Sequence, residues 1–228
     1  MRFDRSIWLI LPLLALPLAV ANCEPSAVES SPERVPAPMM TSEGAEWLER
    51  PGRELEERPH IVLDAMELRN GDRVAEIGTG TGYFARRIAK RIAPDGVVYA
   101  VDIQQEMLDL MNESLEREGI DNVEPVLGDP DDPKLADGYF DWILVVDTYH
   151  EFQKPEEMLR KIRAALGPGG RVALVEYRLE GASAEHIRLE HRMSVNQILA
   201  EWLPAGFDLV DRINTLPSQH FLIFEPSE

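Results

Sequence analysis

Three glycines stand at alternate positions in the segment VAEIGTGTGYF, residues 74–84. The apolar residues before them predict a buried strand, and the residues after them begin a segment with helical spacing. Glycines at a strand-to-helix turn let the backbone approach a ligand closely, and the helix N-terminus presents unpaired N–H groups. The segment therefore predicts a strand-turn-helix unit with a small polar cofactor at the turn.

The chain repeats this strand-then-helix order. We expect strands at 73–77, 97–101, 123–127, 140–146, 171–177, 207–213 and 219–225, and helices within 45–57 and 61–68 and at 82–93, 104–118, 155–166 and about 184–203. Strands joined by helices of this length make right-handed crossovers, which give a parallel sheet covered on both faces. Only the last two strands are close enough to form a hairpin. The expected fold is α/β, with a seven-stranded, mostly parallel sheet and a C-terminal antiparallel strand.

Two common nucleotide motifs do not fit the glycine segment. The dinucleotide fingerprint GxGxxG would place its third glycine at position 83, which is Tyr83. A phosphate-binding P-loop would need Lys-Ser or Lys-Thr after the glycines, and neither follows. A nicotinamide cofactor and a nucleoside triphosphate are therefore both disfavoured.

With the spacing GxGxG after an acidic residue, the segment resembles the first motif of the class I methyltransferases that use S-adenosylmethionine (SAM). The resemblance spans about residues 55–225. Asp102 ends the second strand, FDWILVVDTYHEF (140–152) is similar to the fourth-strand motif, and LGPGGRVALVEY (166–177) is similar to the following helix-turn-strand. The resemblance implies a Rossmann-like three-layer sandwich, SAM as cofactor and methyl transfer to a small-molecule acceptor.

The resemblance also implies roles for single residues. Glu76 would face the cationic methionine end of SAM, Asp102 would accept from both ribose hydroxyls, and Asp129 would accept from the adenine amino group. Pro130 departs from the family pattern because it has no N–H to offer the adenine ring. Two alternatives stay open: Asp102 as a helix cap, and Asp129 as a solvated turn residue. The implied cofactor set is Glu76, Gly78, Thr79, Gly80, Gly82, Tyr83, Asp102, Ile103, Asp129 and Asp147.

The chemistry itself needs few residues. Methyl transfer from a sulfonium is an in-line displacement, so the protein mainly aligns the donor and the nucleophile. His150 and Asp147 are the candidate catalytic residues, because they follow the fourth strand and a base assists an O–H or N–H acceptor. The pKa of histidine suits proton transfer near neutral pH. The alternative for His150 is a histidine hydrogen-bonded within its loop.

No metal site is expected. His186 and Glu190 are four residues apart and could share a helix face, but His191 would point about 140° away on helical geometry. The only cysteine is Cys23, which excludes a cysteine-based zinc cluster.

The charge balance limits the partners. Lys and Arg number 23 against 41 Asp and Glu, which gives a net charge of −18. Such a field repels phosphate backbones, so nucleic acid is not an expected partner. The sequence gives no prediction of the oligomeric state.

Residues 1–22 have the layout of a bacterial export signal, with two arginines before an apolar run. The small residues ending at Ala21 fit ordinary signal peptidase, whereas the segment ending at Cys23 resembles a lipoprotein box, with Asn22 as a departure. We expect a protein of the periplasm or cell envelope, either cleaved after Ala21 or lipid-anchored to the membrane at Cys23. Residues 23–40 are rich in Pro, Ser and Glu and predict a flexible tether, followed by a methyltransferase domain at 41–228.

Two rival hypotheses remain. The motifs quoted above bind a cofactor and do not react, so the chain could be a non-catalytic SAM-binding sensor or scaffold of the envelope. A start at Met39 or Met40 would instead give a cytoplasmic enzyme.

Overall fold

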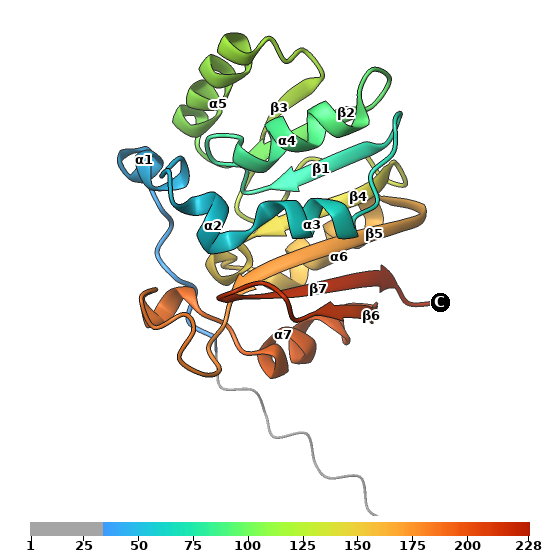
Figure 1. Ribbon diagram of the computed structural model, residues 1–228. Coiled ribbons are helices and arrows are strands. Elements are labelled where there is room, and N and C mark those ends of the chain that lie inside the picture. The colour runs from blue at the N-terminus through green and yellow to red at the C-terminus, as the bar shows by residue number, and fades with distance from the viewer. Residues whose placement is uncertain (1–33) are drawn as a thin grey trace, which may run out of the picture. The chain divides into compact units, whose positions relative to one another are not determined.

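The computed structural model describes residues 34–228, and its centre is a seven-stranded sheet with the order β3-β2-β1-β4-β5-β7-β6 (Figure 1). The strands are β1 (Arg73–Ile77), β2 (Val97–Asp102), β3 (Val123–Leu127), β4 (Phe140–Val146), β5 (Leu166–Tyr177), β6 (Phe207–Ile213) and β7 (Gln219–Pro226). Strands β1 to β5 pair in parallel, and β7 runs antiparallel to both β5 and β6. The predicted α/β sheet is confirmed.

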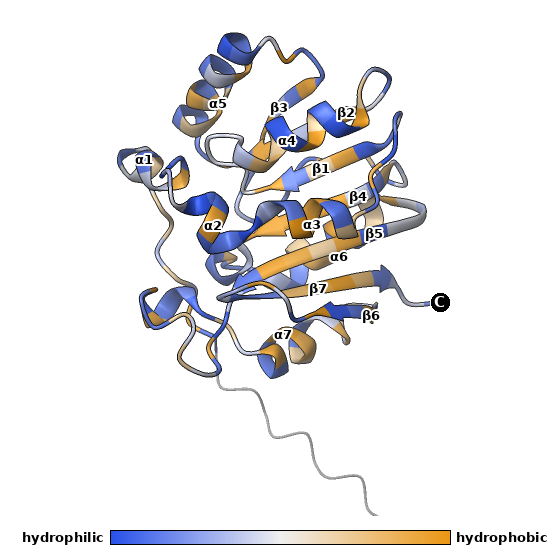
Figure 2. Cartoon of the chain, viewed as in Figure 1, coloured by the Kyte–Doolittle hydropathy of each residue, from blue (hydrophilic) through white to orange (hydrophobic). Residues whose placement is uncertain are grey.

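Helices cover both faces of this sheet. They are α1 (Ala45–Leu48), α2 (Arg53–Glu57), α3 (Pro59–Ala65), α4 (Tyr83–Ile92), α5 (Gln105–Glu118), α6 (Pro155–Ala165) and α7 (Val195–Trp202), with 3-10 turns η1 (Ser42–Gly44), η2 (Tyr149–Glu151) and η3 (Leu189–His191). Apolar side chains of α3, α4 and α5 pack on one face, and those of α6 and α7 pack on the other. Figure 2 shows hydrophobic residues along the central strands between these layers. The expected three-layer sandwich is therefore present.

The central strands divide their side chains between two cores. In β1, Val74 belongs to the core under α4, whereas Ala75 and Ile77 belong to the core under α6. In β4, Leu144 and Val145 divide in the same way. Because both faces are covered, these strands are almost continuously apolar, and this made them recognisable in the sequence.

Short-range signals set several helix ends. Pro155 occupies the first turn of α6, where its missing N–H costs nothing. The Ser194 hydroxyl caps α7 by accepting from the N–H of Gln197 at 3.1 Å. Gly119 ends α5 in the left-handed conformation, with φ of 65°.

The long helix expected at 184–203 was wrong. Only η3 and α7 form within this range. The N–H of Met193 donates to the carbonyl of Tyr177 at 2.9 Å, so the segment folds back on the end of β5 instead of making helical bonds. Strand β5 also begins earlier than predicted, at Leu166 rather than 171.

Residues 34–40, part of the segment expected to be a tether, pack against the domain; we call them the N-terminal strap. Ala37 is buried, and its N–H donates to the carbonyl of His150 at 3.0 Å. The N–H of Met40 donates to the carboxylate of Glu151 at 3.4 Å. The ordered packing therefore starts ahead of the boundary predicted from composition.

The predicted export signal, residues 1–22, and Cys23 lie outside the described residues. Among residues 34–228, no helix has both the length and the apolar character needed to cross a membrane.

The core under α7 gives a stability prediction. Trp202 is fully buried and stacks on Phe224, with ring centroids 4.4 Å apart. Trp202→Ala should lower the free energy of unfolding by about 3–5 kcal/mol, because it removes the ring and leaves a cavity. Leu203→Ala is the matched control, because Leu203 is 47% exposed, and its effect should stay within about 0.5 kcal/mol. Urea denaturation measures the free energy of unfolding of both variants. A loss for Trp202→Ala as small as that for Leu203→Ala would contradict the packing described.

Candidate active site

A cavity of about 950 Å³ lies at the carboxyl ends of β1, β2 and β4. The chain leaves β1 toward β2 and leaves β4 toward β5, so the two loops diverge between these neighbouring strands. Open α/β sheets bind ligands at such a switch point. The loop after β1, the end of β2, the loop after β4 and the N-terminal strap all line the cavity.

The glycine loop forms one wall. Gly78, Gly80 and Gly82 have φ of 76°, 53° and 78°, a region that favours glycine. A Cβ on Gly78 would lie 2.3 Å from the side chain of Thr148, and one on Gly80 would lie 2.7 Å from Leu48. Gly78 and Gly80 line the cavity, whereas Gly82 starts α4 and is not among the lining residues.

Two buried carboxylates flank this loop. The carboxylate of Asp102, at the end of β2, accepts from the N–H of Gly80 at 2.9 Å and from the N–H of Gln104 at 3.0 Å. It does not cap α5, whose N-cap is Gln104 itself. Glu76, in β1, accepts from the hydroxyl of Thr79 at 2.9 Å. Both carboxylates line the cavity.

Burial disfavours the charged form of both carboxylates. It raises the pKa of Glu76 to about 8, against the hydrogen bond from Thr79 and the charge of Arg53. Burial also raises the pKa of Asp102, against the backbone N–H groups that it accepts from. A cationic ligand group would favour the ionised forms. This end of the cavity is therefore suited to a ligand with a positive charge.

The other predicted cofactor residues surround the same space. Thr79, Tyr83, Ile103 and Asp129 all line the cavity. The Tyr83 hydroxyl lies 3.1 Å from Glu54, to which it donates. Asp129 is exposed and pairs with Lys134 at 3.0 Å, as a solvated turn residue would.

Asp147 follows β4 and has an unusual environment. Its φ is 48°, which is uncommon for a residue other than glycine. Oδ2 accepts from the amide of Gln219 at 2.7 Å, whereas Oδ1 is buried without a hydrogen-bond partner. Burial and the charges of Glu57 and Glu176 raise its pKa well above the ordinary value. Asp147 is therefore a buried carboxyl group at the cavity whose surroundings disfavour its charged form.

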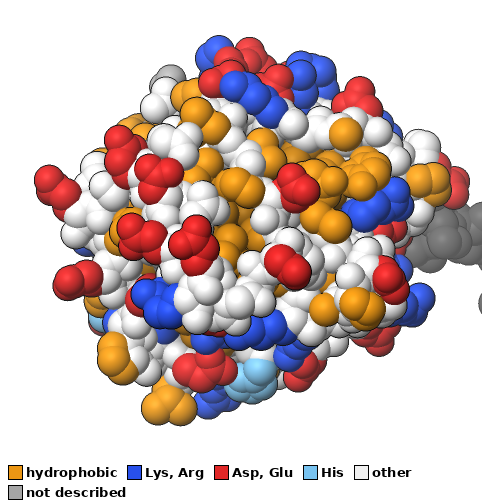
Figure 3. All heavy atoms as spheres, turned by 90° about the horizontal axis from the view of Figure 1, so that it is seen from above, with side chains coloured by type: hydrophobic (Ala, Val, Ile, Leu, Met, Phe, Trp, Pro, Cys, Tyr) orange, Lys and Arg blue, Asp and Glu red, His pale blue; other side chains and the backbone are white. Residues whose placement is uncertain are grey.

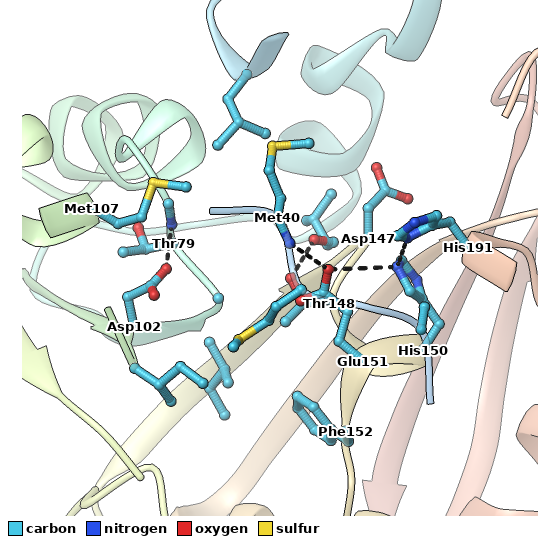
Figure 4. Close-up of a pocket in the computed structure, with 18 of the residues that line it drawn as sticks. Met40, Thr79, Asp102, Met107, Asp147, Thr148, His150, Glu151, Phe152 and His191 are labelled. Atoms are coloured by element: carbon cyan, nitrogen blue, oxygen red, sulfur yellow. Dashed lines mark hydrogen bonds and ion pairs between the residues drawn. The ribbon is translucent and has the colours of Figure 1, made fainter. Parts of the chain in front are cut away.

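His150 is fixed on both sides of its ring. Nδ1 lies 2.7 Å from the Glu176 carboxylate of β5, and Nε2 lies 3.1 Å from Nδ1 of His191. Burial lowers the pKa of His150, but the Glu176 carboxylate outweighs this effect and the pKa is raised. Figure 4 shows His150 and His191 on one side of the cavity, and Asp102 with Thr79 on the other.

Several lining residues were missed from the sequence. Glu176 lies behind the lining residues, near the end of the apolar strand β5, and within residues 34–228 it is the charged residue with no exposure; its place in an apolar strand is a sequence signal that was not used. Arg53 and Glu57 pair at 2.8 Å on α2, and Glu57 also accepts from the hydroxyl of Tyr177 at 3.1 Å. No sequence motif identifies either residue of this pair, because their role depends on the position of α2 over the cavity.

His186 and Glu190, which we considered together in the sequence, lie in different surroundings. His186 lines the cavity, whereas Glu190 is exposed and pairs with Arg188. Only His191 of that segment contacts His150.

Comparisons with known proteins agree with this geometry. Residues 74–170 match the sequence profile of a family described as "Methyltransferase domain". The chain is 34% identical over 108 residues to a protein-L-isoaspartate O-methyltransferase of Ignicoccus hospitalis, covering 46% of this chain and 50% of that protein. It is 31% identical over 129 residues to a ubiquinone/menaquinone biosynthesis C-methyltransferase of Neisseria meningitidis, covering 54% and 52%. The chain thus spans about half the length of these curated relatives.

Solved structures share the fold. A SAM-dependent methyltransferase from Aquifex aeolicus aligns with a TM-score of 0.76 at 23% identity, covering 82% of this chain and 98% of that one. A methyltransferase in complex with the Trm112 activator of Haloferax volcanii aligns with a TM-score of 0.66 at 18% identity, covering 82% and 97%. At these identities the likeness shows the Rossmann-like methyltransferase fold.

The burial of Glu76 predicts a pH dependence of stability. Its pKa is about 8 when folded and 4.5 ordinarily, so folding takes up a proton between these values. The free energy of unfolding should therefore fall as the pH rises from about 4.5 to about 8, by at most about 5 kcal/mol. Glu76→Gln should flatten this dependence in urea denaturation series at several pH values. A variant with the slope of the parent would contradict the role given to Glu76.

Proposed function

We propose that the protein transfers a methyl group from SAM to a small-molecule acceptor. The observation that carries the proposal is a single cavity with the glycine loop, Glu76 and Asp102 at one end and His150 at the other. The match to the methyltransferase-domain profile and the methyltransferases among the relatives support it.

The residues present fit the cofactor. A side chain at Gly78 or Gly80 would collide with Thr148 or Leu48, so only glycine lets the loop pass this close to its neighbours while its backbone lines the cavity. Each oxygen of Asp102 accepts one backbone N–H and has a second lone pair for a ribose hydroxyl. Glu76 would hold the cationic end. The further proposed contacts are Thr79, Tyr83, Ile103, Asp129 and Asp147.

When bound, SAM supplies a methyl group that is already activated by the sulfonium. The protein therefore has to bind SAM and the acceptor, to align the methyl group with the acceptor atom, and to exclude water. The N-terminal strap covers part of the cavity through its bond to the carbonyl of His150. The acceptor would lie between the glycine loop and His150.

The acceptor is proposed to be a small molecule. A cavity of about 950 Å³ matches the size of sites that enclose such ligands. The net charge of −18 opposes a polyanionic partner. On the face shown in Figure 3, acidic and basic side chains are intermixed, and no basic patch gathers there.

Binding of SAM is the first test. Asp102→Asn should weaken it by about 1.5–3 kcal/mol in isothermal titration, because charge-assisted bonds to the ribose are replaced by poorer ones. Asp129→Asn is the matched control, since Asp129 is exposed, and its loss should be smaller. Absence of binding by the parent below about millimolar concentration would refute the proposal.

Transfer is a separate test. Isotopically labelled SAM incubated with small-molecule extracts should label at least one acceptor, and Asp102→Asn should reduce the labelling. Binding without transfer to any acceptor would favour the non-catalytic sensor or scaffold.

We also propose export to the periplasm or cell envelope, on the basis of residues 1–22 and Cys23. Firm membrane attachment would need the several acyl chains that lipoprotein processing adds. Cell fractionation of the parent and of Cys23→Ser should show membrane association that is lost in the variant. Soluble periplasmic protein in both would indicate cleavage after Ala21, and cytosolic protein with an intact N-terminus would contradict export.

A further inference from the structure

Three side chains at the His150 end of the cavity bring metal-binding atoms together. Ligand atoms of His150, Glu151 and His191 all lie within 4.8 Å of one another. Nε2 of His150 is 3.1 Å from Nδ1 of His191 and 4.0 Å from Oε1 of Glu151. Two nitrogen ligands of one tetrahedral zinc ion, each at about 2.0–2.1 Å, stand about 3.3 Å apart. The two histidines are already at this separation.

We propose that His150, Glu151 and His191 bind one divalent transition-metal ion of the zinc type. Two histidines and one carboxylate form a ligand set used by catalytic zinc sites, which keep a further position open. All three residues line the described cavity, so an ion held by them would be accessible from the space of the acceptor.

The second shell supports this assignment. The Glu176 carboxylate, with no exposure, lies 2.7 Å from Nδ1 of His150; when Nδ1–H donates to it, the neutral ring offers Nε2 to a metal ion. Histidine ligands of metal ions almost always have such a partner on the other ring nitrogen. The two imidazole rings stand at 90° to each other, with Nε2 of His150 3.1 Å from Nδ1 of His191.

Two carboxylates gather at the site. Glu151 and Glu176 both face His150. Within residues 34–228, neither carboxylate forms an ion pair with a lysine or arginine. A divalent ion would offset their negative charge. The Glu151 carboxylate accepts from the N–H of Met40 at 3.4 Å, and its Oε1 lies 4.0 Å from Nε2 of His150.

The sequence did not reveal this group, because its members are far apart in the chain. His150 and Glu151 belong to η2 after β4, and His191 belongs to η3. The helical spacing of His186 and Glu190 led us to consider these two residues as metal ligands, and neither belongs to the group.

An ion at this site also defines the acceptor. A bound metal ion lowers the pKa of a hydroxyl that it coordinates. The acceptor would then be a small molecule that presents a hydroxyl or thiol to the ion and loses its proton to water on binding. Its oxygen or sulfur would form the bond to the methyl carbon as the bond from that carbon to the SAM sulfur breaks. This choice of acceptor rests on the proposed methyl transfer, whereas the ion site does not.

Zinc content is the direct test. The full-length chain, without a histidine tag, is loaded with zinc sulfate, dialysed and measured by elemental mass spectrometry. The parent should retain one zinc ion per chain, and His191→Ala should retain only background. His186→Ala is the matched control, because it removes another cavity-lining histidine and should retain the ion. His191 is half-buried, so its removal leaves the packed core intact.

Glu176→Gln separates positioning from ligation. It leaves all three ligands in place and should raise the zinc Kd about 10–100-fold, with unchanged thermal unfolding of the metal-free protein. No retained zinc in the parent, or equal zinc in His191→Ala, would overturn the proposal and leave a hydrogen-bonded histidine pair. Titration with SAM on the same samples keeps the two proposals distinct, because failure to bind SAM would not affect the zinc result.

Discussion

The site depends on the divergence of two loops, those that follow the neighbouring strands β1 and β4. These strands pair in parallel, yet the loop after β1 returns toward β2 and the loop after β4 toward β5. The divergence leaves a crevice that the sheet itself cannot fill. Most groups given a role in binding or chemistry lie on one of these two loops, at the end of β2, or on a segment that covers the crevice. The others include Glu76 within β1, Asp129 after β3 and Glu176 in β5.

The two sides of this crevice differ in chemistry. The β1 and β2 side presents backbone N–H groups, the glycine loop and two buried carboxylates, an environment suited to a polar cation with hydroxyl groups. The β4 and β5 side presents His150, which Glu176 holds, and His191, together with Asp147, whose neighbours disfavour its ionised form. Under the proposed function, the cofactor would bind on the first side and the acceptor on the second. A metal ion at His150, Glu151 and His191 would lie on the acceptor side.

The sequence predicted the parts of the fold that are decided locally. Strand β1 and its glycine loop were recognisable because burial on both faces and positive φ leave few residue choices. The helix expected at 184–203 was wrong because the backbone there bonds to Tyr177, a partner fixed only by the tertiary fold. Contacts between distant segments could not be read, and Glu176 against His150 is the clearest case.

The sequence also predicted the conformation of the N-terminal strap but not its contacts. Its Pro-rich composition favours an extended chain without secondary structure, and the structure agrees on this point. Composition could not show that Ala37 would find a partner in the carbonyl of His150. An extended segment leaves its backbone N–H and C=O groups available for hydrogen bonds to other parts of the protein. In this structure the strap uses them to pack over the cavity.

We propose that one cavity holds the cofactor on the β2 side and the acceptor on the β4 side. A crystal structure with S-adenosylhomocysteine, the demethylated product, tests it most directly. We predict that the ribose lies against Asp102 and the amino acid end near Glu76, with the sulfur directed toward His150. Binding of the product elsewhere on the protein, or with its ribose remote from Asp102, would contradict the account.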